Sequence, residues 1–341
     1  MKAIAFGAKM AATAVVLMGW SATSTAIADP TVEQLDNPGA EDGVLAPWVS
    51  DPAGAADSVF FLFANSGNRV FSAFEETVTA GGQVVISQDV DVSGCGVEGL
   101  DGSFSADGFA NVRRDDTGQL AVNLDDGSSA SGAILDALLN PLAWQQLGPV
   151  TGPISADAAV ATVSMTSTDV DEDEEALLRY DDMSFRITCV ADFAKISGTK
   201  EMHGGKGGDS KDKGPVWTFG GTVGHMDDED SSLAGTISIN YRELGPSSCE
   251  FTPTSITYTS PFSVAIEADY ECTGGDKDGA TGTATIALTA RDASGCSGAK
   301  DRGSVAVSAD DSDLDIFGSS GETGEENCLA TGNVIIVPPP A

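Results

Sequence analysis

Basic residues are scarce in this chain: 17 Lys and Arg stand against 52 Asp and Glu, and the formal net charge is −35 at pH 7. Such an acidic chain repels the phosphate backbone, so nucleic acid is excluded as a partner. Charges of one sign also repel each other, until salt shortens the Debye length to about 10 Å at 0.1 M. We therefore expect an acidic surface suited to salty surroundings.

Long hydrophobic runs are also missing, and no membrane insertion is expected. The apolar run Met10–Trp20 is too short to span a bilayer comfortably, and no later run is longer. Two lysines precede it, and Ala26-Ile27-Ala28 follows with the small-x-small pattern that signal peptidase needs. Residues 1–28 therefore predict a signal peptide cleaved after Ala28, and a secreted protein.

The chain has only two histidines, His203 and His225, and both fall in Gly- or acid-rich stretches that predict loops. Nucleophilic catalysis needs a base beside the nucleophile, and no Gly-x-Ser-x-Gly motif is present. We therefore expect no Ser-His-Asp hydrolase and, more broadly, no enzyme. A hydrolase with a carboxylate pair stays open as an alternative, because the spatial separation that it needs cannot be read from so acidic a sequence.

Six cysteines in an exported chain predict three disulfides, with fifteen connectivities possible. Cys95 and Cys189 lie in the first half, and the other four lie beyond residue 240. If the halves are separate domains, Cys95 must pair with Cys189. Among the rest, pairs that bracket a predicted hairpin or paired strands are favoured: Cys249 with Cys272, and Cys296 with Cys328.

Short β-rich segments fill the first half, at 83–92, 104–112, 119–124 and 158–166. The run Val59–Phe63, VFFLF, predicts a strand buried on both faces, although an exposed aromatic stripe for sugar stacking is the alternative. Residues 134–147 could form one or two amphipathic helical turns, since Pro141 precludes a long helix. The segment Ala176–Cys189 predicts a closing strand whose apolar face, from Met183 onward, points into a core.

An ordered set of motifs spans the first half: Asn37-Pro38-Gly39-Ala40-Glu41, Ser66-Gly67-Asn68-Arg69, Ile86–Val90, Ser103–Ser105, Trp144 and Tyr180-Asp181-Asp182. In this order the set resembles the galactose-binding-like jelly rolls of secreted carbohydrate-binding modules, over roughly Gln34–Val190. One departure is Ala40, where that family usually has an aromatic residue. The resemblance implies a jelly-roll fold and a binding role, but it does not name the ligand.

The same resemblance implies a structural calcium ion between the opening Glu and an acid of the closing strand. The matching positions are Glu41 and Asp182, with Asp181 as a less certain neighbour. The alternative is that these acids are simply solvated at the rim. Two further acidic stretches approach the calcium-loop spacing of EF-hands without matching it: Asp169, Asp171 and Asp173, and Asp311, Asp313, Asp315 and Glu322.

The polar, Gly-rich stretch 204–214 is the best boundary in the chain. Beyond it, Thr-, Val- and Ile-rich segments predict a second β-sandwich, faintly similar to the post-COAP accessory domains of bacterial secreted proteins. We therefore predict an all-β fold of two sandwiches, with a jelly roll at 29–192, a flexible boundary at 193–215 and the second domain at 216–341.

Taken together, these features predict a secreted, non-catalytic protein whose jelly roll binds carbohydrate or another extracellular surface ligand. The alternative is a structural or adhesive component of the matrix or cell surface without a small ligand, in which both sandwiches are spacers. The sequence does not locate a sugar site, because such sites depend on aromatic and amide side chains in variable loops.

Overall fold

The computed structural model describes residues 33–62, 64–74, 82–112, 116–136, 143–168, 176–201, 216–227, 231–241, 245–290, 303–316 and 328–339. Within these ranges the chain is all-β, as predicted. The strands pair antiparallel, and two short 3-10 turns join them, η2 (Gly275–Lys277) and η5 (Ser312–Leu314). No helix in these ranges is long and apolar enough to cross a membrane.

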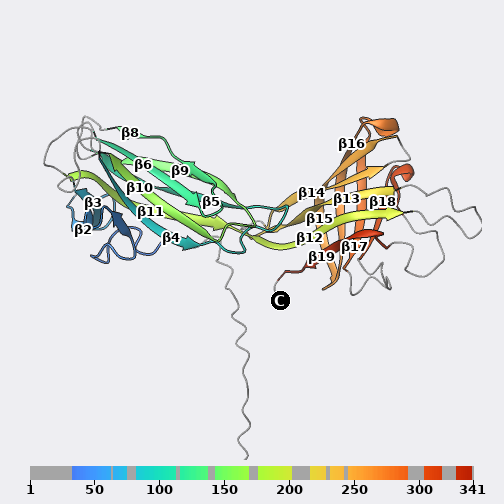
Figure 1. The fold of residues 1–341 in the computed structure, drawn as a ribbon, viewed down its shortest axis with the longest axis horizontal. Helices are drawn as coiled ribbons and strands as arrows, with labels where there is room; N and C mark the ends of the chain where they lie inside the picture. The colour runs from blue at the N-terminus through green and yellow to red at the C-terminus, as the bar shows by residue number, and fades with distance from the viewer. Residues whose placement is uncertain are drawn as a thin grey trace, which may run out of the picture.

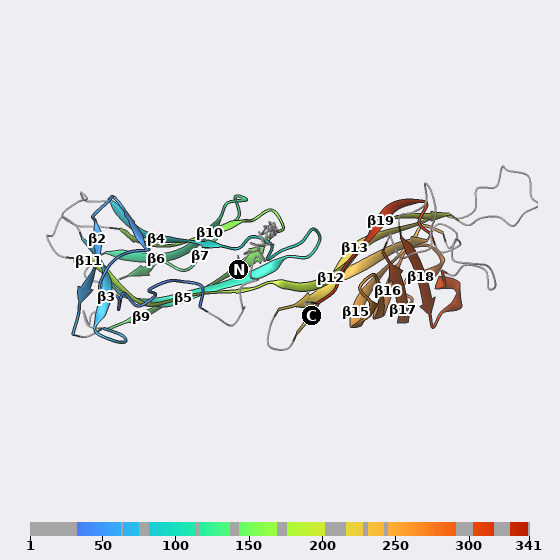
Figure 2. The same cartoon turned by 90° about the horizontal axis from the view of Figure 1, so that it is seen from below.

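The first unit is a sandwich of two antiparallel sheets, as predicted (Figures 1 and 2). One sheet has the order β1-β4-β10-β6-β7, with β8 also on β6, and the other has the order β2-β3-β11-β5-β9. From β4 to β11 the chain passes repeatedly from one sheet to the other. The strands are β1 (Val49–Asp51), β2 (Ala56–Phe60), β3 (Arg69–Phe74), β4 (Gln83–Asp91), β5 (Gly102–Val112), β6 (Thr117–Leu124), β7 (Ser129–Ser131), β8 (Leu135–Asp136), β9 (Gln145–Ile154), β10 (Val160–Thr168) and β11 (Ala176–Thr188).

Alternate apolar residues of both sheets meet in one core between them. Trp48 packs against Phe71 there, with ring centroids 5.3 Å apart, and its indole nitrogen donates to the Asp36 carbonyl. Ala40, the departure from the jelly-roll pattern, is fully buried in this core, and its carbonyl accepts a hydrogen bond from Ser58. The opening loop is therefore packed in place without an aromatic residue at position 40.

Strand β11 changes its inward face at a β-bulge. Leu178 and Tyr180 point into the core before the bulge, and Met183, Phe185 and Ile187 do so after it, which confirms the prediction from Met183 onward. The register against β5 shifts between Asp181 and Ser184. A bulge adds one residue to one strand, so the period-2 alternation restarts out of phase beyond it.

The helical turns expected at 134–147 are not seen where the structure describes this segment. Leu135 and Asp136 form β8 on β6, and Gln145 already begins β9, whereas 137–142 lie outside the described residues. The Gln145 side chain donates to the Asp136 carbonyl, so the two short ends meet. The spaced leucines that suggested a helix are thus divided between two strand edges and the segment that joins them.

The second unit is one eight-stranded sheet in the order β18-β17-β16-β15-β14-β13-β12-β19. All eight strands contribute side chains to a single apolar core, so the sheet folds around that core, and its far ends meet at a bridge between Ser304 and Cys328. The strands are β12 (Val190–Glu201), β13 (Val216–Met226), β14 (Leu233–Tyr241), β15 (Ser247–Ser260), β16 (Ser263–Thr273), β17 (Thr281–Thr289), β18 (Ser304–Ala309) and β19 (Thr331–Val337).

The predicted flexible boundary at 193–215 is wrong over its first part, because 193–201 belong to β12. This strand pairs with both β13 and β19, and only Cys189 separates it from β11. Its buried face carries the polar Asp192 as well as Ala194 and Ile196. The apolar alternation that would predict a strand is therefore interrupted in the sequence. Residues 202–215 lie outside the described ranges, and the division into two folding domains stays a prediction.

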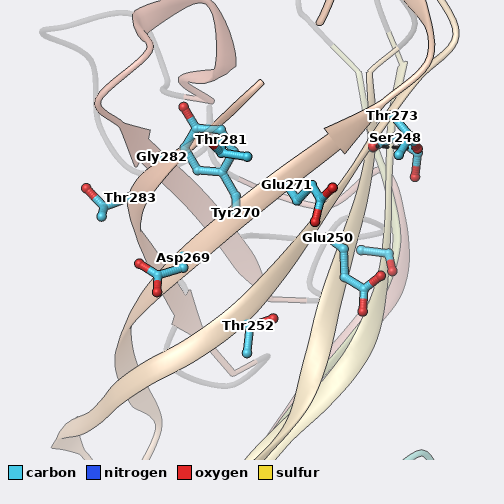
Figure 3. Close-up of a pocket in the computed structure, with 11 residues that line it drawn as sticks. Ser248, Glu250, Thr252, Asp269, Tyr270, Glu271, Thr273, Thr281, Gly282 and Thr283 are labelled. Carbon is cyan, nitrogen blue, oxygen red and sulfur yellow. Dashed lines mark hydrogen bonds between the residues drawn. The ribbon is translucent and has the colours of Figure 1, made fainter. Parts of the chain in front are cut away.

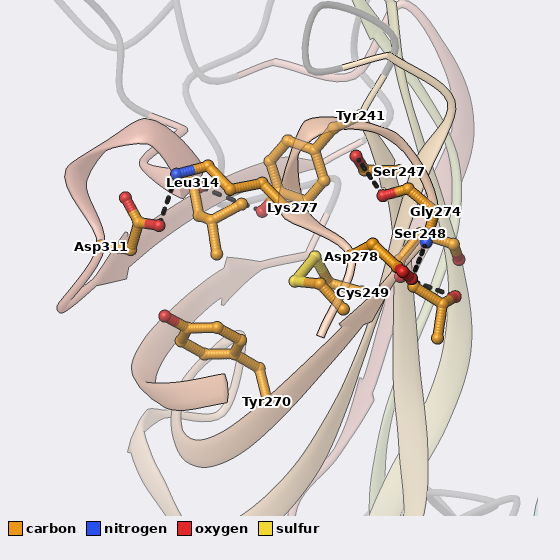
Figure 4. Close-up of a disulfide and its surroundings, with 12 residues drawn as sticks. Tyr241, Ser247, Ser248, Cys249, Tyr270, Gly274, Lys277, Asp278, Asp311 and Leu314 are labelled. Carbon is orange, nitrogen blue, oxygen red and sulfur yellow. Dashed lines mark hydrogen bonds and ion pairs between the residues drawn. A yellow bond between two sulfur atoms is a disulfide. The ribbon is translucent and has the colours of Figure 1, made fainter. Parts of the chain in front are cut away.

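Two of the three predicted disulfides are formed, Cys95–Cys189 and Cys249–Cys272. The second joins β15 to β16 across one register position and faces the core of the second unit, near Tyr241 and Leu314 (Figure 4). Cys328 is also disulfide-bonded, but its predicted partner Cys296 lies outside the described residues.

Candidate functional site

The run Val59–Phe63 is not buried on both faces, contrary to the prediction. Among the described strands, β2 lies at the edge of its sheet and pairs with β3 alone, and the strand ends at Phe60. Phe60 is 66% exposed and Leu62 is 72% exposed, while Phe63 lies outside the described residues. A run of apolar residues fits a central strand only if neighbours cover both sides, and an edge position leaves one side open.

Phe61, between these two exposed side chains, is held by a tryptophan and an arginine. The ring of Trp144 meets it edge-on at a centroid distance of 6.4 Å, and the Arg179 guanidinium carbon lies 4.4 Å from its ring centre. Such an edge-on pair and a stacked guanidinium are both favourable contacts of an aromatic ring. We call Phe60, Phe61, Leu62, Trp144 and Arg179 the aromatic patch.

The outer face of the second sheet positions the Phe61, Trp144 and Arg179 part of this patch. Arg179 on β11 stands opposite Asn111 on β5, and the buried Asn111 amide donates to the Ala143 carbonyl at 2.8 Å. That bond fixes the chain just before Trp144. Sequence reasoning noted Trp144 as a family motif and as part of possible helical turns, and it missed Arg179. Both residues contact Phe61, and they come from segments far apart in the chain.

The structure places Glu41, one predicted metal ligand, against the loop 65–68 and the start of β3. Its Oε1 accepts hydrogen bonds from the backbone N–H of Asn68 and of Arg69, both at 3.0 Å. A Cβ at Gly67 would overlap the Glu41 carboxylate, so this position needs glycine. Glu41 thus ties the opening loop to the second sheet.

Asp181 and Asp182, the other two predicted ligands, lie at the bulge of β11 and face the same loop. Asp182 has a left-handed φ of 49°, and its carboxylate accepts from the side chains of Asn65 and Ser66. Asp181 is fully buried, and its carboxylate accepts from the backbone N–H of Ser66 and of Asp182. Burial raises the pKa of the Asp181 carboxyl to about 6, although these hydrogen bonds lower it.

The three acids are therefore brought to one place. A Cβ at Gly39 would lie 3.6 Å from Asp181 Oδ1, 3.7 Å from Glu41 Cγ and 3.9 Å from Asp182 Oδ1. Their oxygens are the donors that calcium prefers, yet each carboxylate is directed at N–H or O–H donors of the loop. Across the described ranges, no group of three or more His, Cys, Asp or Glu side chains is arranged to hold a metal ion.

The second EF-hand-like stretch holds a lysine of the chain itself. Lys277 Nζ lies 2.5 Å from Asp311 Oδ2 (Figure 4) and 2.9 Å from Asp313 Oδ2. These hydrogen bonds raise the pKa of Lys277. Asp315 accepts from the backbone N–H of Ala309. A side-chain ammonium thus offsets part of the loop charge that suggested calcium. Glu322 and the stretch with Asp169, Asp171 and Asp173 lie outside the described residues.

His225 lies on β13 and not in a loop, contrary to the prediction. Its Nδ1 is 3.0 Å from Asp192 Oδ1, which also accepts a 2.6 Å hydrogen bond from the hydroxyl of Tyr258. Burial and this bond to Asp192 raise the pKa of Tyr258. Asp192 is 4% exposed, so these contacts satisfy a buried carboxylate and fix the imidazole ring. His203 lies outside the described residues.

No family model and no curated protein matches the sequence. Among solved structures, the carbohydrate-binding module TmCBM61 in complex with β-1,4-galactotriose aligns at a TM-score of 0.36 and 16% identity, over 46% of this chain and 98% of that chain. The enzymatically active domain of tailspike protein 4 from bacteriophage CBA120 aligns at a TM-score of 0.33 and 9% identity, over 46% of this chain and 22% of that one. Likenesses this low carry no argument about function.

Proposed function

We propose that the protein is an exported, non-catalytic binding protein whose N-terminal sandwich binds carbohydrate or another extracellular surface ligand at the aromatic patch. The observation that carries this proposal is the exposure of Phe60 and Leu62, the sequence neighbours of Phe61, whose ring contacts Trp144 and Arg179. Aromatic rings cover the apolar faces of sugars, and neighbouring polar groups fix orientation. The two disulfides support export, because such bonds persist in oxidising compartments.

Retention of the protein, freed of residues 1–28, on insoluble polysaccharides tests this proposal, with a glycan array to identify the sugar. Phe60→Ala and Leu62→Ala should each weaken binding about tenfold, since they remove contact area from a site that excludes water. Val49→Ala is the matched control, because Val49 is 60% exposed but lies on β1 of the opposite sheet. Equal losses in all three variants would contradict a site at the patch.

The same assay separates the alternatives. A structural or adhesive component without a small ligand would bind no glycan in either format. Release of soluble sugar products from a retained polysaccharide would contradict the non-catalytic role and favour a hydrolase with a carboxylate pair.

A structural calcium ion is a further part of the proposal, with Glu41 and Asp182 as ligands and Asp181 as their neighbour. The convergence of these three acids around Gly39 supports it. The ion would tie the opening loop to β11, and binding would require the carboxylates to exchange some of their hydrogen bonds to loop 65–68 for the ion.

A further inference from the structure

A loop of the first unit reaches across to the second unit. Residues 92–101 join β4 to β5, and Val97 and Leu100 bridge to each other, so that Gly99 lies in the turn at the tip. A Cβ at Gly99, whose φ is +88°, would lie 2.7 Å from the Thr222 hydroxyl on β13, so the tip needs glycine to approach this closely. We call residues 92–101 the strap.

Contacts of three kinds hold the tip of the strap. The Thr222 hydroxyl donates to the Glu98 carbonyl at 2.9 Å, and Lys195 Nζ on β12 lies 2.5 Å from the Glu98 carboxylate. A small buried apolar cluster lies between the units: Leu100, Val190 and Met226. Two domains of one chain are expected to move relative to each other unless a large apolar interface joins them. These contacts are few, and the Glu98 side chain is 87% exposed, so they do not fix the joint by themselves.

The base of the strap is tied to the joint between the two units, which lie end to end where β11 passes into β12 (Figures 1 and 2). Cys189 is the single residue between these strands, and it is bonded to Cys95 of the strap. The Cys95 carbonyl accepts a hydrogen bond from the Val190 N–H at 2.9 Å. The Cys189 carbonyl accepts one at 2.7 Å from the N–H of Asp227, which follows β13. A covalent bond and two backbone hydrogen bonds therefore meet at the residue that links the units.

We propose that the Cys95–Cys189 disulfide is a lock for this joint: once it forms, it holds the strap against β12 and β13 and fixes the angle between the two units. Before it forms, the small interface lets the units move. Formation removes two electrons and two protons from the two thiols, and the disulfide of a thiol oxidant takes them up by exchange and becomes a dithiol. Cys95 and Cys189 are 2% and 3% exposed, so a reductant reaches the bond only when the joint opens. The lock does not depend on the function proposed for the aromatic patch.

Small-angle X-ray scattering of the full chain, freed of residues 1–28, tests the lock. Two rigidly joined units give a distance distribution with a separate peak for the distances between them, and free motion smears that peak. The wild type should show the peak, and Cys95→Ala with Cys189→Ala should lose it. Cys249→Ala with Cys272→Ala is the control, because it removes a disulfide within the second unit and should keep the peak. A peak that is kept in the first variant, or lost in both, would overturn the proposal.

A second variant asks whether the tip of the strap fixes the angle instead. Glu98→Gln with Thr222→Val removes the polar contacts of the tip and keeps the disulfide, so the peak should remain. Glu271→Gln is the control for the lost charge, because Glu271 lines a groove of about 820 Å³ on the outer face of the second unit (Figure 3). Loss of the peak in Glu98→Gln with Thr222→Val, but not in the control, would show that the tip and not the disulfide sets the angle.

Amide hydrogen exchange of the wild type tests the lock without any substitution, and so decides the question even if the alanine pair does not fold. The Val190 and Asp227 amides donate to the two cysteine carbonyls and exchange only when the joint opens. With the disulfide formed, they should exchange as slowly as the Ala194 and Ile196 amides, which lie in β12 between two paired strands. Exchange at least about tenfold faster at the joint would show that the joint opens while the disulfide is intact, and the proposal would fail.

Discussion

At the scale of single residues, the acids around loop 65–68 show how carboxylates stabilise a loop without a basic partner. Glu41 accepts hydrogen bonds from two backbone N–H groups, and Asp181 accepts hydrogen bonds from two others. Hydrogen bonds to charged acceptors contribute about 1.5 to 3 kcal/mol each when buried, and less when exposed. These contacts hold the loop in place when no metal ion is bound, so a test for calcium must preserve them in the metal-free protein.

Glu41→Gln is the substitution that preserves them. The amide oxygen of Gln can still accept from Asn68 and Arg69, although as a neutral acceptor, so with chelator the free energy of unfolding should fall by only about 1 kcal/mol relative to wild type. Calcium at a hundred times its dissociation constant should stabilise wild type by about 2.7 kcal/mol, and Glu41→Gln should lose most of that gain. Thermal melting with calcium and with chelator measures both quantities.

Asp42→Asn provides the control for this experiment, because it removes a charge from the same loop at a position outside the proposed ligand set. It should keep the calcium gain. Two outcomes would contradict the calcium site: chelation leaves the wild-type melting temperature unchanged, or Asp42→Asn loses as much of the calcium stabilisation as Glu41→Gln does. In either case the three acids would act only as hydrogen-bond acceptors for loop 65–68.

At the scale of elements, the residues of β11 show what a sequence pattern can and cannot predict. The apolar alternation from Met183 onward correctly predicts a core face, and the placement of Cys95 and Cys189 as the two cysteines of the first half correctly predicts their pairing. The bulge at Asp181 could not be predicted, because a one-residue shift of register depends on the partner strand β5. It is this shift that turns Asp181 and Asp182 toward loop 65–68.

The aromatic patch could not be predicted from the sequence for a related reason. VFFLF has the composition of a buried strand, and only the sheet order reveals that β2 has a neighbour on one side alone. The partners of Phe61 come from before β9 and from β11, far away in the chain. Exposure at an edge is decided by tertiary pairing, so no local pattern distinguishes Phe60 from a core residue.

The disulfides allow a prediction at this scale, because they close loops of different length. Cys95 and Cys189 are 94 residues apart, and Cys249 and Cys272 are 23 apart. Chain-entropy arguments give about 4.7 and about 3.4 kcal/mol for these closures. Replacing the first pair by alanines should therefore lower the free energy of unfolding more than replacing the second pair.

Guanidinium unfolding of both double variants checks this order. Tryptophan fluorescence reports on both units, since Trp48 is buried in the first and Trp217 in the second. A larger loss for Cys249→Ala with Cys272→Ala would contradict this order and would show that the short bridge also stabilises the folded state, where it joins β15 to β16 in register.

At the scale of the whole molecule, the two units meet in a small interface of their own. Leu100, Val190 and Met226 form a buried cluster between them, and Thr222 donates to the Glu98 carbonyl at 2.9 Å. Lys195 adds an ion pair with Glu98 at 2.5 Å. The loop before β5 therefore rests on β12 and β13, and the two units are joined by packing as well as by the direct passage from β11 to β12.

The charge of the whole chain sets the last prediction. With 52 acids against 17 basic residues, repulsion among carboxylates opposes the compact state, and opposed pairs such as Glu250 and Glu271 add to it locally. Added NaCl should raise the melting temperature up to a few tenths molar, as the Debye length falls below about 10 Å. The rise should then level off, because screening saturates while the packed cores are unchanged.

Two comparisons separate screening from general salt effects. NaCl and KCl at equal ionic strength should act alike if screening dominates, whereas a rise that continues without limit and differs between salts would indicate exclusion of salt from the surface. The variant with both Glu250→Gln and Glu271→Gln should start from a higher melting temperature and gain less from salt. A wild-type melting temperature that stays flat or falls with NaCl would mean that the acids are already balanced within the fold.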